Sequence, residues 1–187
     1  MPLPERFSVP LEVEIRAATE TDLPNLEWYG LYSLHRQIMD TAFEAQGRGE
    51  VLMLLAVANG FPIGQAWIDF VARADEPQVA LIWAVRVFPF LTGGGIGRLL
   101  LGAAEAAIRD RGRTTAEIGV EKDNPRARRL YERLGYRFDR ELLEEFTFND
   151  WQGNPVIQRV DQWMLRKRVG NTAPLAALHA AAAVEEG

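Results

Sequence analysis

The 187-residue chain contains no cysteine and only two histidines. The absence of cysteine excludes disulfide bonds, thiolate zinc ligands and a cysteine nucleophile. Two histidines without a cysteine also make a poor set of metal ligands, so we expect no metal site. Any chemistry must therefore come from backbone groups and from other side chains.

Long apolar runs are absent as well. The longest, Val51 to Ala58, has eight residues, whereas a membrane-spanning helix needs about 20. The N-terminal sequence MPLPERFSVP has no apolar stretch of the kind found in a signal peptide. We therefore expect a soluble, cytoplasmic protein with no membrane partner.

Positive charge is in the minority, with 21 basic and 26 acidic side chains and a formal net charge of −5. This balance argues against a nucleic-acid partner. The net charge is −6 over residues 1–97, +4 over 98–140 and −3 over 141–187. The pattern fits either solvated helix faces or an anionic ligand beside an acidic mouth, and by itself it does not choose between them.

The apolar periodicity predicts a mixed α/β fold in one domain over residues 1–169, followed by an alanine-rich tail over 170–187. The turn sequence Asn59-Gly60-Phe61-Pro62 is short enough to join two of the strands as an antiparallel hairpin. Strands are expected near residues 13–17, 52–58, 63–71, 79–87, 115–120, 136–140 and 156–165, and helical segments near 23–34, 38–46, 98–111 and 125–134. Residues 149–155 are rich in turn formers and separate 146–148 from the last strand.

The most informative stretch runs from Val85 to Arg98, where an apolar strand leads through a glycine-rich turn into a helix. In such a turn several backbone N–H groups and the positive end of the helix dipole converge on one small volume, which favours a phosphate. A purely structural glycine turn remains the alternative.

Two nucleotide-binding motifs do not match this stretch. A Walker loop needs Lys-Ser or Lys-Thr after its last glycine, but Gly97 is followed by Arg98 and Leu99. This disfavours a nucleotide-dependent phosphotransferase. A Rossmann fingerprint that started at Gly93 would place its third glycine on Arg98, so it fails too.

The stretch instead resembles the pyrophosphate loop of the GNAT superfamily of acyl-CoA-dependent N-acetyltransferases. The family pattern is Gln/Arg-x-x-Gly-x-Gly/Ala after a Val-x-Val strand, and Gly95-x-Gly97 and Val85-x-Val87 match it. Thr92 departs from the pattern, because the family usually has Gln or Arg there. Backbone amides would then have to dominate the binding of the phosphates.

A second stretch, Asn124-x-x-Ala127-x-x-Leu130-Tyr131-x-x-Leu134-Gly135-Tyr136, is similar to the other signature of this family. In that signature an asparagine opens a helix, a tyrosine follows on it, and Leu-Gly-Phe/Tyr leads into a strand. The resemblance covers residues 15–165 and implies a GNAT-like fold, with a central, mixed, mostly antiparallel sheet flanked by helices that parts near Val87.

The resemblance also implies acetyl-CoA as co-substrate and no metal. The pantetheine arm would lie along the 85–87 strand and the pyrophosphate on the loop amides, with further arginines at 126, 128 and 129 as candidate phosphate partners. The residues expected to bind the co-substrate are Val85, Arg86, Val87, Thr92, Gly93, Gly94, Gly95, Ile96, Gly97, Arg98, Asn124 and Tyr131.

For catalysis, the resemblance implies that Tyr131 protonates the leaving thiolate; its alternative role is to pack the helix against the sheet. Asn124 would bond the pantetheine arm or merely cap its helix. The 81–87 strand has no carboxylate, so the general base must come from elsewhere or act through water. Glu121 is the candidate that we select, and Asp69 and His35 are further candidates. The alternative for the two acids is a solvated or ion-paired surface position, and for His35 a structural role.

The implied function is transfer of the acetyl group of acetyl-CoA to a primary amine. The acidic outer segments favour a cationic small molecule or peptide as acceptor. Tyr29, Tyr32 and the tryptophans at 28 and 83 are candidates for an aromatic wall of the acceptor site. The alternative is a catalytically silent acyl-CoA-binding or regulatory module, and the oligomeric state, including a homodimer, stays open.

Overall fold

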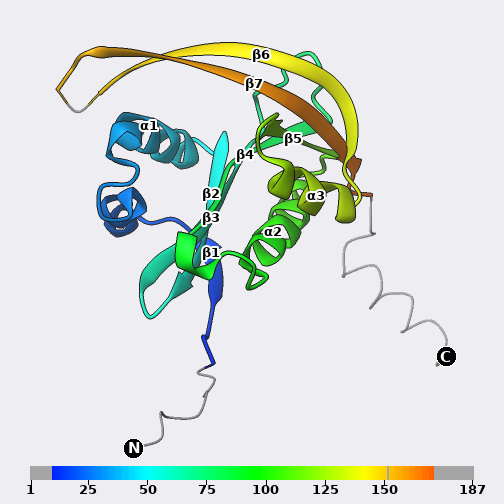
Figure 1. Cartoon of the computed structure of the whole chain (residues 1–187). Coiled ribbons are helices and arrows are strands. Elements are labelled where there is room, and N and C mark those ends of the chain that lie inside the picture. The colour runs from blue at the N-terminus through cyan, green and yellow to red at the C-terminus, as the bar shows by residue number, and fades with distance from the viewer. Residues whose placement is uncertain (1–9, 151, 171–187) are drawn as a thin grey trace, which may run out of the picture.

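The computed structural model describes residues 10–150 and 152–170 of the chain (Figure 1). Seven strands form one sheet in the order β1-β2-β3-β4-β5-β7-β6. Neighbouring strands are antiparallel except β4 and β5, which are parallel. The strands are β1 (Glu14–Ala17), β2 (Val51–Ala58), β3 (Phe61–Asp69), β4 (Val79–Val87), β5 (Thr115–Glu121), β6 (Arg137–Asn149) and β7 (Pro155–Arg168).

Helices cover both faces of the sheet (Figure 1). The α1 face buries a core that includes Met53, Leu55 and Trp67, and the α2 face buries a second core that includes Ile82 and Ile118. The predicted mixed, mostly antiparallel sheet flanked by helices is therefore confirmed. The helices are α1 (Arg36–Gly47), α2 (Ile96–Asp110) and α3 (Pro125–Arg133), and the short 3₁₀ segments are η1 (Glu20–Glu27), η2 (Ser33–His35) and η3 (Pro89–Leu91).

The helical segment predicted near residues 23–34 is two short 3₁₀ helices, η1 and η2, rather than one regular helix. Thr19 and Asp22 form a capping box at its start. Trp28, Tyr29 and Gly30 all have positive φ values, which interrupts the helix. The indole Nε1 of Trp28 donates a hydrogen bond to the carbonyl of Pro62 at 2.9 Å, and this bond fixes the interruption against β3.

The last two strands are much longer than the sequence indicated. Strands β6 and β7 pair from Arg137 to Asn149, whereas short strands over 136–140 and 156–165 were expected. The turn expected over 149–155 agrees with the pairing of Asn149 with Pro155. Glutamates at 141, 144 and 145 hide the strand pattern of β6. The hairpin arches over α1 (Figure 1), where Phe148 stacks on His35 with ring centroids 5.8 Å apart.

The first turn of α2 packs tightly on β3 at Gly64. A Cβ at Gly64 would lie 3.0 Å from a methyl of Leu100 and 3.1 Å from a methyl of Ile96. A glycine at this position therefore lets the beginning of α2 approach the sheet closely. This contact sets the position of the loop that precedes α2.

Two predictions concern the ends of the chain. The single domain over residues 1–169 stays a prediction, and the tail over 170–187 falls almost entirely outside the described residues. Within residues 10–150 and 152–170, none of the helices has the length and apolarity needed to cross a membrane.

Glu117 on β5 connects this strand to β7, β6 and the loop after β3 through buried charge. Its side chain is 1% exposed, and it accepts hydrogen bonds from Arg140 at 2.7 and 3.0 Å, from Arg166 at 2.6 Å and from Arg73 at 3.2 Å. Burial alone would raise the pKa of the Glu117 carboxyl. The hydrogen bonds and charges of Arg140 and Arg166 outweigh burial and hold that pKa below its ordinary value.

We expect Glu117→Gln to lower the free energy of unfolding by about 2 kcal/mol or more, because it leaves three arginines without their buried carboxylate. Urea denaturation measures the change. Glu145→Gln is the control, since its ion pair with Arg159 is exposed and is worth less than about 1 kcal/mol. Equal effects of the two substitutions would show that the buried cluster adds no stability.

The same cluster predicts an acid dependence of stability. A carboxyl with a lowered pKa in the folded protein stabilises it fully above its pKa in the unfolded chain, about 4.5 for a glutamate. This contribution is lost as the pH falls from there through the lowered pKa. Glu117→Gln should therefore flatten the fall in stability below that pH, as urea denaturation at a series of acidic pH values would show.

Candidate active site

The sheet opens between β4 and β5. The two strands pair only from Val79–Ile82 of β4 to Thr115–Ile118 of β5, although both continue further. Beyond Ile82, β4 contains a bulge. Trp83 and Arg86 are three residues apart on β4, but their partners on β3, Trp67 and Gln65, are only two residues apart. Ala84 in this bulge has a φ of 50°. Because a bulge bends its strand, β4 turns away from β5 and leaves unpaired main-chain groups at a V-shaped opening.

Two cavities meet at this opening. One, of about 770 Å³, lies toward α1 and the β6–β7 hairpin, and the other, of about 730 Å³, lies toward α2 and α3. A molecule in one cavity can therefore reach a molecule in the other through the parted strands. The residues that line both are Val85, Arg86, Asn124, Ala127 and Tyr131.

The glycine-rich loop lines the second cavity. Gly95 caps α2 with a φ of 89°, a conformation that favours glycine. The amide of Gly94 donates to the carbonyl of Leu91 at 3.3 Å, and the amides of Arg98 and Leu99 donate to the carbonyl of Gly95 at 3.0 and 3.1 Å. Within the described residues, the loop amides without a backbone acceptor are those of Gly93, Gly95, Ile96 and Gly97.

Three arginines line the same cavity as the glycine-rich loop. Arg98, Arg126 and Arg133 line the second cavity, and a Cβ at Gly93 would lie 3.3 Å from Nη2 of Arg126. Over residues 10–150 and 152–170 none of the three makes an ion pair. Free amides, a helix N-terminus and unpaired arginines together suit a ligand with adjacent phosphates.

The arginines at 128 and 129 are less well placed than the sequence suggested. The guanidinium of Arg128 lies 4.0 Å from the ring centroid of Trp163 and pairs with Glu132 at 2.8 Å. Neither Arg128 nor Arg129 lines a cavity described above. Arg133 lines the second cavity instead, and no local pattern separates it from the other arginines on the same helix.

Tyr131 lies on α3 at the junction of the two cavities. It is 5% exposed, and burial raises the pKa of its hydroxyl to about 12. The hydroxyl therefore keeps its proton at neutral pH and is able to donate it. Asn124 caps the same helix by accepting a hydrogen bond from the amide of Ala127 at 3.1 Å, which is the alternative role that the sequence left open. Its bond to the pantetheine arm stays a prediction.

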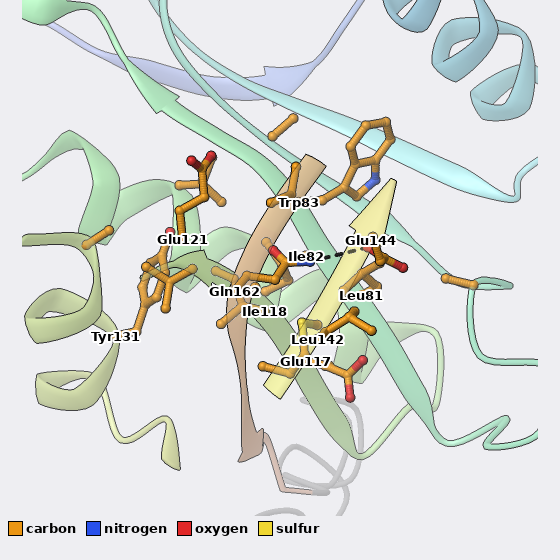
Figure 2. Close-up of a pocket in the computed structure, with 18 of the residues that line it drawn as sticks. Leu81, Ile82, Trp83, Glu117, Ile118, Glu121, Tyr131, Leu142, Glu144 and Gln162 are labelled. Carbon is orange, nitrogen blue, oxygen red and sulfur yellow. Dashed lines mark hydrogen bonds between the residues drawn. The ribbon is translucent and has the colours of Figure 1, made fainter. Parts of the chain in front are cut away.

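Two carboxylates face the first cavity from opposite walls. Glu121 lies at the end of β5, and Glu144 lies on β6, where it accepts a hydrogen bond from Gln162 at 3.3 Å. In Figure 2, Glu121 and Tyr131 lie on one side of this pocket, and Trp83 and Glu144 lie on the other. Neither glutamate makes an ion pair within the described residues.

The two other candidates for the general base, Asp69 and His35, have other roles. Asp69 lines the first cavity, but its Oδ1 accepts hydrogen bonds from the amides of Val71 and Ala72 at 2.8 and 2.7 Å and so closes a turn. His35 lines neither cavity and stacks on Phe148.

Of the other residues predicted for the site, some line a cavity and some do not. Trp83 lines the first cavity, and Thr92 lines the second, with its hydroxyl donating to the carbonyl of Pro89 at 2.9 Å. Gly94 and Ile96 do not line the second cavity, and Ile96 is buried in the core. Trp28 is buried, whereas Tyr29 is 87% exposed.

The sequence reasoning missed Glu144 and Gln162. Both side chains point from the β6–β7 hairpin into the first cavity. A signal for Glu144 exists, because it alternates with Leu142 and Phe146 and so shares one face of a strand with them. That signal becomes visible only when β6 is known to continue past residue 140.

Comparison with known proteins identifies relatives. A model of the "Acetyltransferase (GNAT) family" matches residues 17–136. A curated relative, L-2,4-diaminobutyric acid acetyltransferase from Streptomyces coelicolor, is 36% identical over 105 residues, which are 53% of this chain and 61% of that protein. Mycothiol acetyltransferase from Rhodococcus erythropolis is 42% identical over 88 residues, which are 45% of this chain and 29% of that protein.

A solved structure shows the same fold. The protein yncA from Salmonella typhimurium, described with its cofactor acetyl-CoA, has a TM-score of 0.65 and 20% sequence identity, and the match covers 87% of this chain and 97% of that one. The matched part of the two curated relatives is about three fifths of the first and under a third of the second.

Proposed function

We propose, because this chain belongs to the GNAT family of acetyltransferases, that it transfers the acetyl group of acetyl-CoA directly to a primary amine. The observation that carries the proposal is the junction of two cavities at the parted strands, with Tyr131 lining both. One cavity would take the co-substrate and the other the acceptor.

The residues of the second cavity fit coenzyme A. The free amides of the loop and the guanidinium groups of Arg98 and Arg126 would bind the pyrophosphate, since both kinds of group favour adjacent anionic oxygens. The parted edge of β4 from Val85 to Val87 would pair with the amides of the pantetheine arm, as an added strand does. Thr92 and Asn124 line the path between these two parts.

Bound in this way, acetyl-CoA supplies an activated thioester. A backbone N–H of β4 in the 85–87 segment would stabilise negative charge that develops on the carbonyl oxygen. Glu121 would accept a proton from the ammonium of the acceptor, so that the neutral nitrogen attacks the carbonyl carbon. As the carbon–nitrogen bond forms and the carbon–sulfur bond breaks, Tyr131 would donate a proton to the leaving sulfur. The attacking nitrogen would then lose its extra proton, and a proton would return to the Tyr131 oxygen through solvent, which leaves a neutral amide, a thiol and the restored hydroxyl.

The charges of the first cavity support a cationic acceptor, either a small molecule or a peptide amine. Glu121 and Glu144 face the cavity without ion-pair partners among the described residues, so they would attract ammonium groups. The relative from Streptomyces coelicolor is named for an acceptor with two amines, 2,4-diaminobutyric acid. A cationic diamine is therefore the first class of acceptor to test.

A screen of acetyl-CoA consumption would test the proposal. The acceptors are 2,4-diaminobutyrate, ornithine and lysine, the diamines that their decarboxylation gives, spermidine, a peptide with a free N-terminus and an uncharged primary amide. We expect turnover with cationic amines, with acetylated products identified by mass spectrometry. Binding of coenzyme A without any acetylated product would contradict enzymatic function and point to a silent acyl-CoA-binding module.

Tyr131→Phe should lower kcat by about 100-fold, because it removes a general acid. The affinity for coenzyme A, measured by calorimetry, should change by less than roughly twofold, since only a hydroxyl is lost. Tyr136→Phe is the matched control: Tyr136 is also fully buried, but it lines neither cavity. A Tyr131→Phe protein that turns over as fast as the wild type would remove Tyr131 from the mechanism.

Gly95→Asp should weaken the binding of coenzyme A at least roughly tenfold, through a strained positive φ and a negative charge beside the phosphates. No atom lies within 4 Å of a Cβ at Gly95, so a steric clash does not contribute. Gly102→Ala, at an open position further along α2, should leave the affinity unchanged. Calorimetric titration with coenzyme A measures both, and equal affinities would refute the phosphate site.

A further inference from the structure

Arg86 is a half-buried cation on β4, at the point where the sheet opens. Its guanidinium carbon lies 4.1 Å from the ring centroid of Tyr32. Over residues 10–150 and 152–170 the structure gives Arg86 neither an ion pair nor a side-chain hydrogen bond. Burial lowers the pKa of the guanidinium, but an arginine stays charged in proteins. The cation–π contact offsets only part of the cost of this burial.

The side chain of Arg86 lies on the acceptor side of β4. Its neighbour Tyr32 precedes α1, whereas Val85 and Val87 pack against the core on the α2 face. Burial first, and then the charge of Arg86, lower the pKa of His35, so the nearby imidazole is neutral at pH 7. The phosphate side of the junction has its own arginines at 98, 126 and 133. Arg86 is therefore available to a ligand in the first cavity.

The other charges of the first cavity divide into satisfied and free groups. Arg73 pairs with Glu117 and Glu76, and Arg140 pairs with Glu117 and Asp139. Asp69 is held by two backbone amides. The groups left without an ion-pair partner in the described residues are Arg86, Glu121 and Glu144. One free cation and two free anions complement a ligand that carries one anionic group and two cationic nitrogens.

We propose that Arg86 binds a carboxylate of the acceptor and that the acceptor is a diamino acid. The proposal rests on the acetyl transfer proposed above and adds the chemical class of the acceptor. The planar fork of a guanidinium matches a carboxylate in two hydrogen bonds. Glu121 faces the amine that is acetylated, and Glu144, on the opposite wall, faces the second amine.

The test compares each diamino acid with the diamine that lacks only its carboxylate: 2,4-diaminobutyrate with 1,3-diaminopropane, ornithine with putrescine, and lysine with cadaverine. We expect the wild type to favour the amino acid in kcat/KM in the pair that it turns over fastest. Arg86→Gln should lower this ratio roughly 10- to 100-fold, the range for a lost hydrogen bond to a charged group. The ratio cancels any common effect on co-substrate binding or on folding.

Two further variants sharpen the result. Arg86→Lys keeps the charge without the fork, so its ratio should fall between those of the wild type and Arg86→Gln. Arg159→Gln alters an arginine on the hairpin that is 78% exposed and lines neither cavity, and it should keep the wild-type ratio. Both variants are assayed with the same acceptor pairs.

The outcomes separate the two proposals. If the wild type prefers the diamines, or if Arg86→Gln slows both members of a pair equally, Arg86 does not bind an acceptor carboxylate, and this inference fails while acetyl transfer stands. If the wild type acetylates no amine at all, the proposed function fails and this inference fails with it.

Discussion

The parallel pairing of β4 with β5 stops after four residue pairs, and the site depends on that interruption. The pairing ends where the bulge at Ala84 bends β4 away. A fully paired β4 would use its main-chain groups inside the sheet and would close the passage between the two cavities. The neighbouring strand β3 stabilises the bulge, because the side chain of Gln65 donates a hydrogen bond to the carbonyl of Ala84 at 3.2 Å.

The charged groups around the opening are of two kinds: buried groups that pair with one another, and groups lining the cavities that have no ion-pair partner in the described residues. Glu117 lies where β4 and β5 are still paired. Together with Glu76 and Asp139 it balances the charge of Arg73, Arg140 and Arg166. Beyond Ile82 and Ile118 the two strands are no longer paired. There, charged side chains have no ion-pair partner among the described residues. On the α2 side these groups are arginines beside free amides, and on the α1 side they include two glutamates. The two cavities therefore select ligands of different charge although they share one strand.

The sequence was a good guide where function depends on the backbone. The glycine loop before α2 and the asparagine cap of α3 are local features, and their neighbours in the chain determine them. It was a poor guide to the β6–β7 hairpin, because the alternation in β6 includes three glutamates that are typical of a surface segment. Glu144 and Gln162 were missed for that reason. Arg133 could not be distinguished from the arginines at 128 and 129, since helix position alone does not say which one faces a loop distant in the sequence.

The sequence by itself determined the mixed α/β class, the order of strands and helices up to α3, and the likeness to the GNAT family, because hydrophobic periodicity and turn residues act over a few neighbouring positions. The tertiary structure alone decided which charges stay free. Whether Arg86 meets a carboxylate depends on how β4, the segment before α1 and the long hairpin pack together. The segment before α1 and the hairpin are more than 100 residues apart in the chain, since η2 ends at His35 and β6 begins at Arg137. Since an ion pair acts over only a few ångströms, no local pattern records its presence or absence.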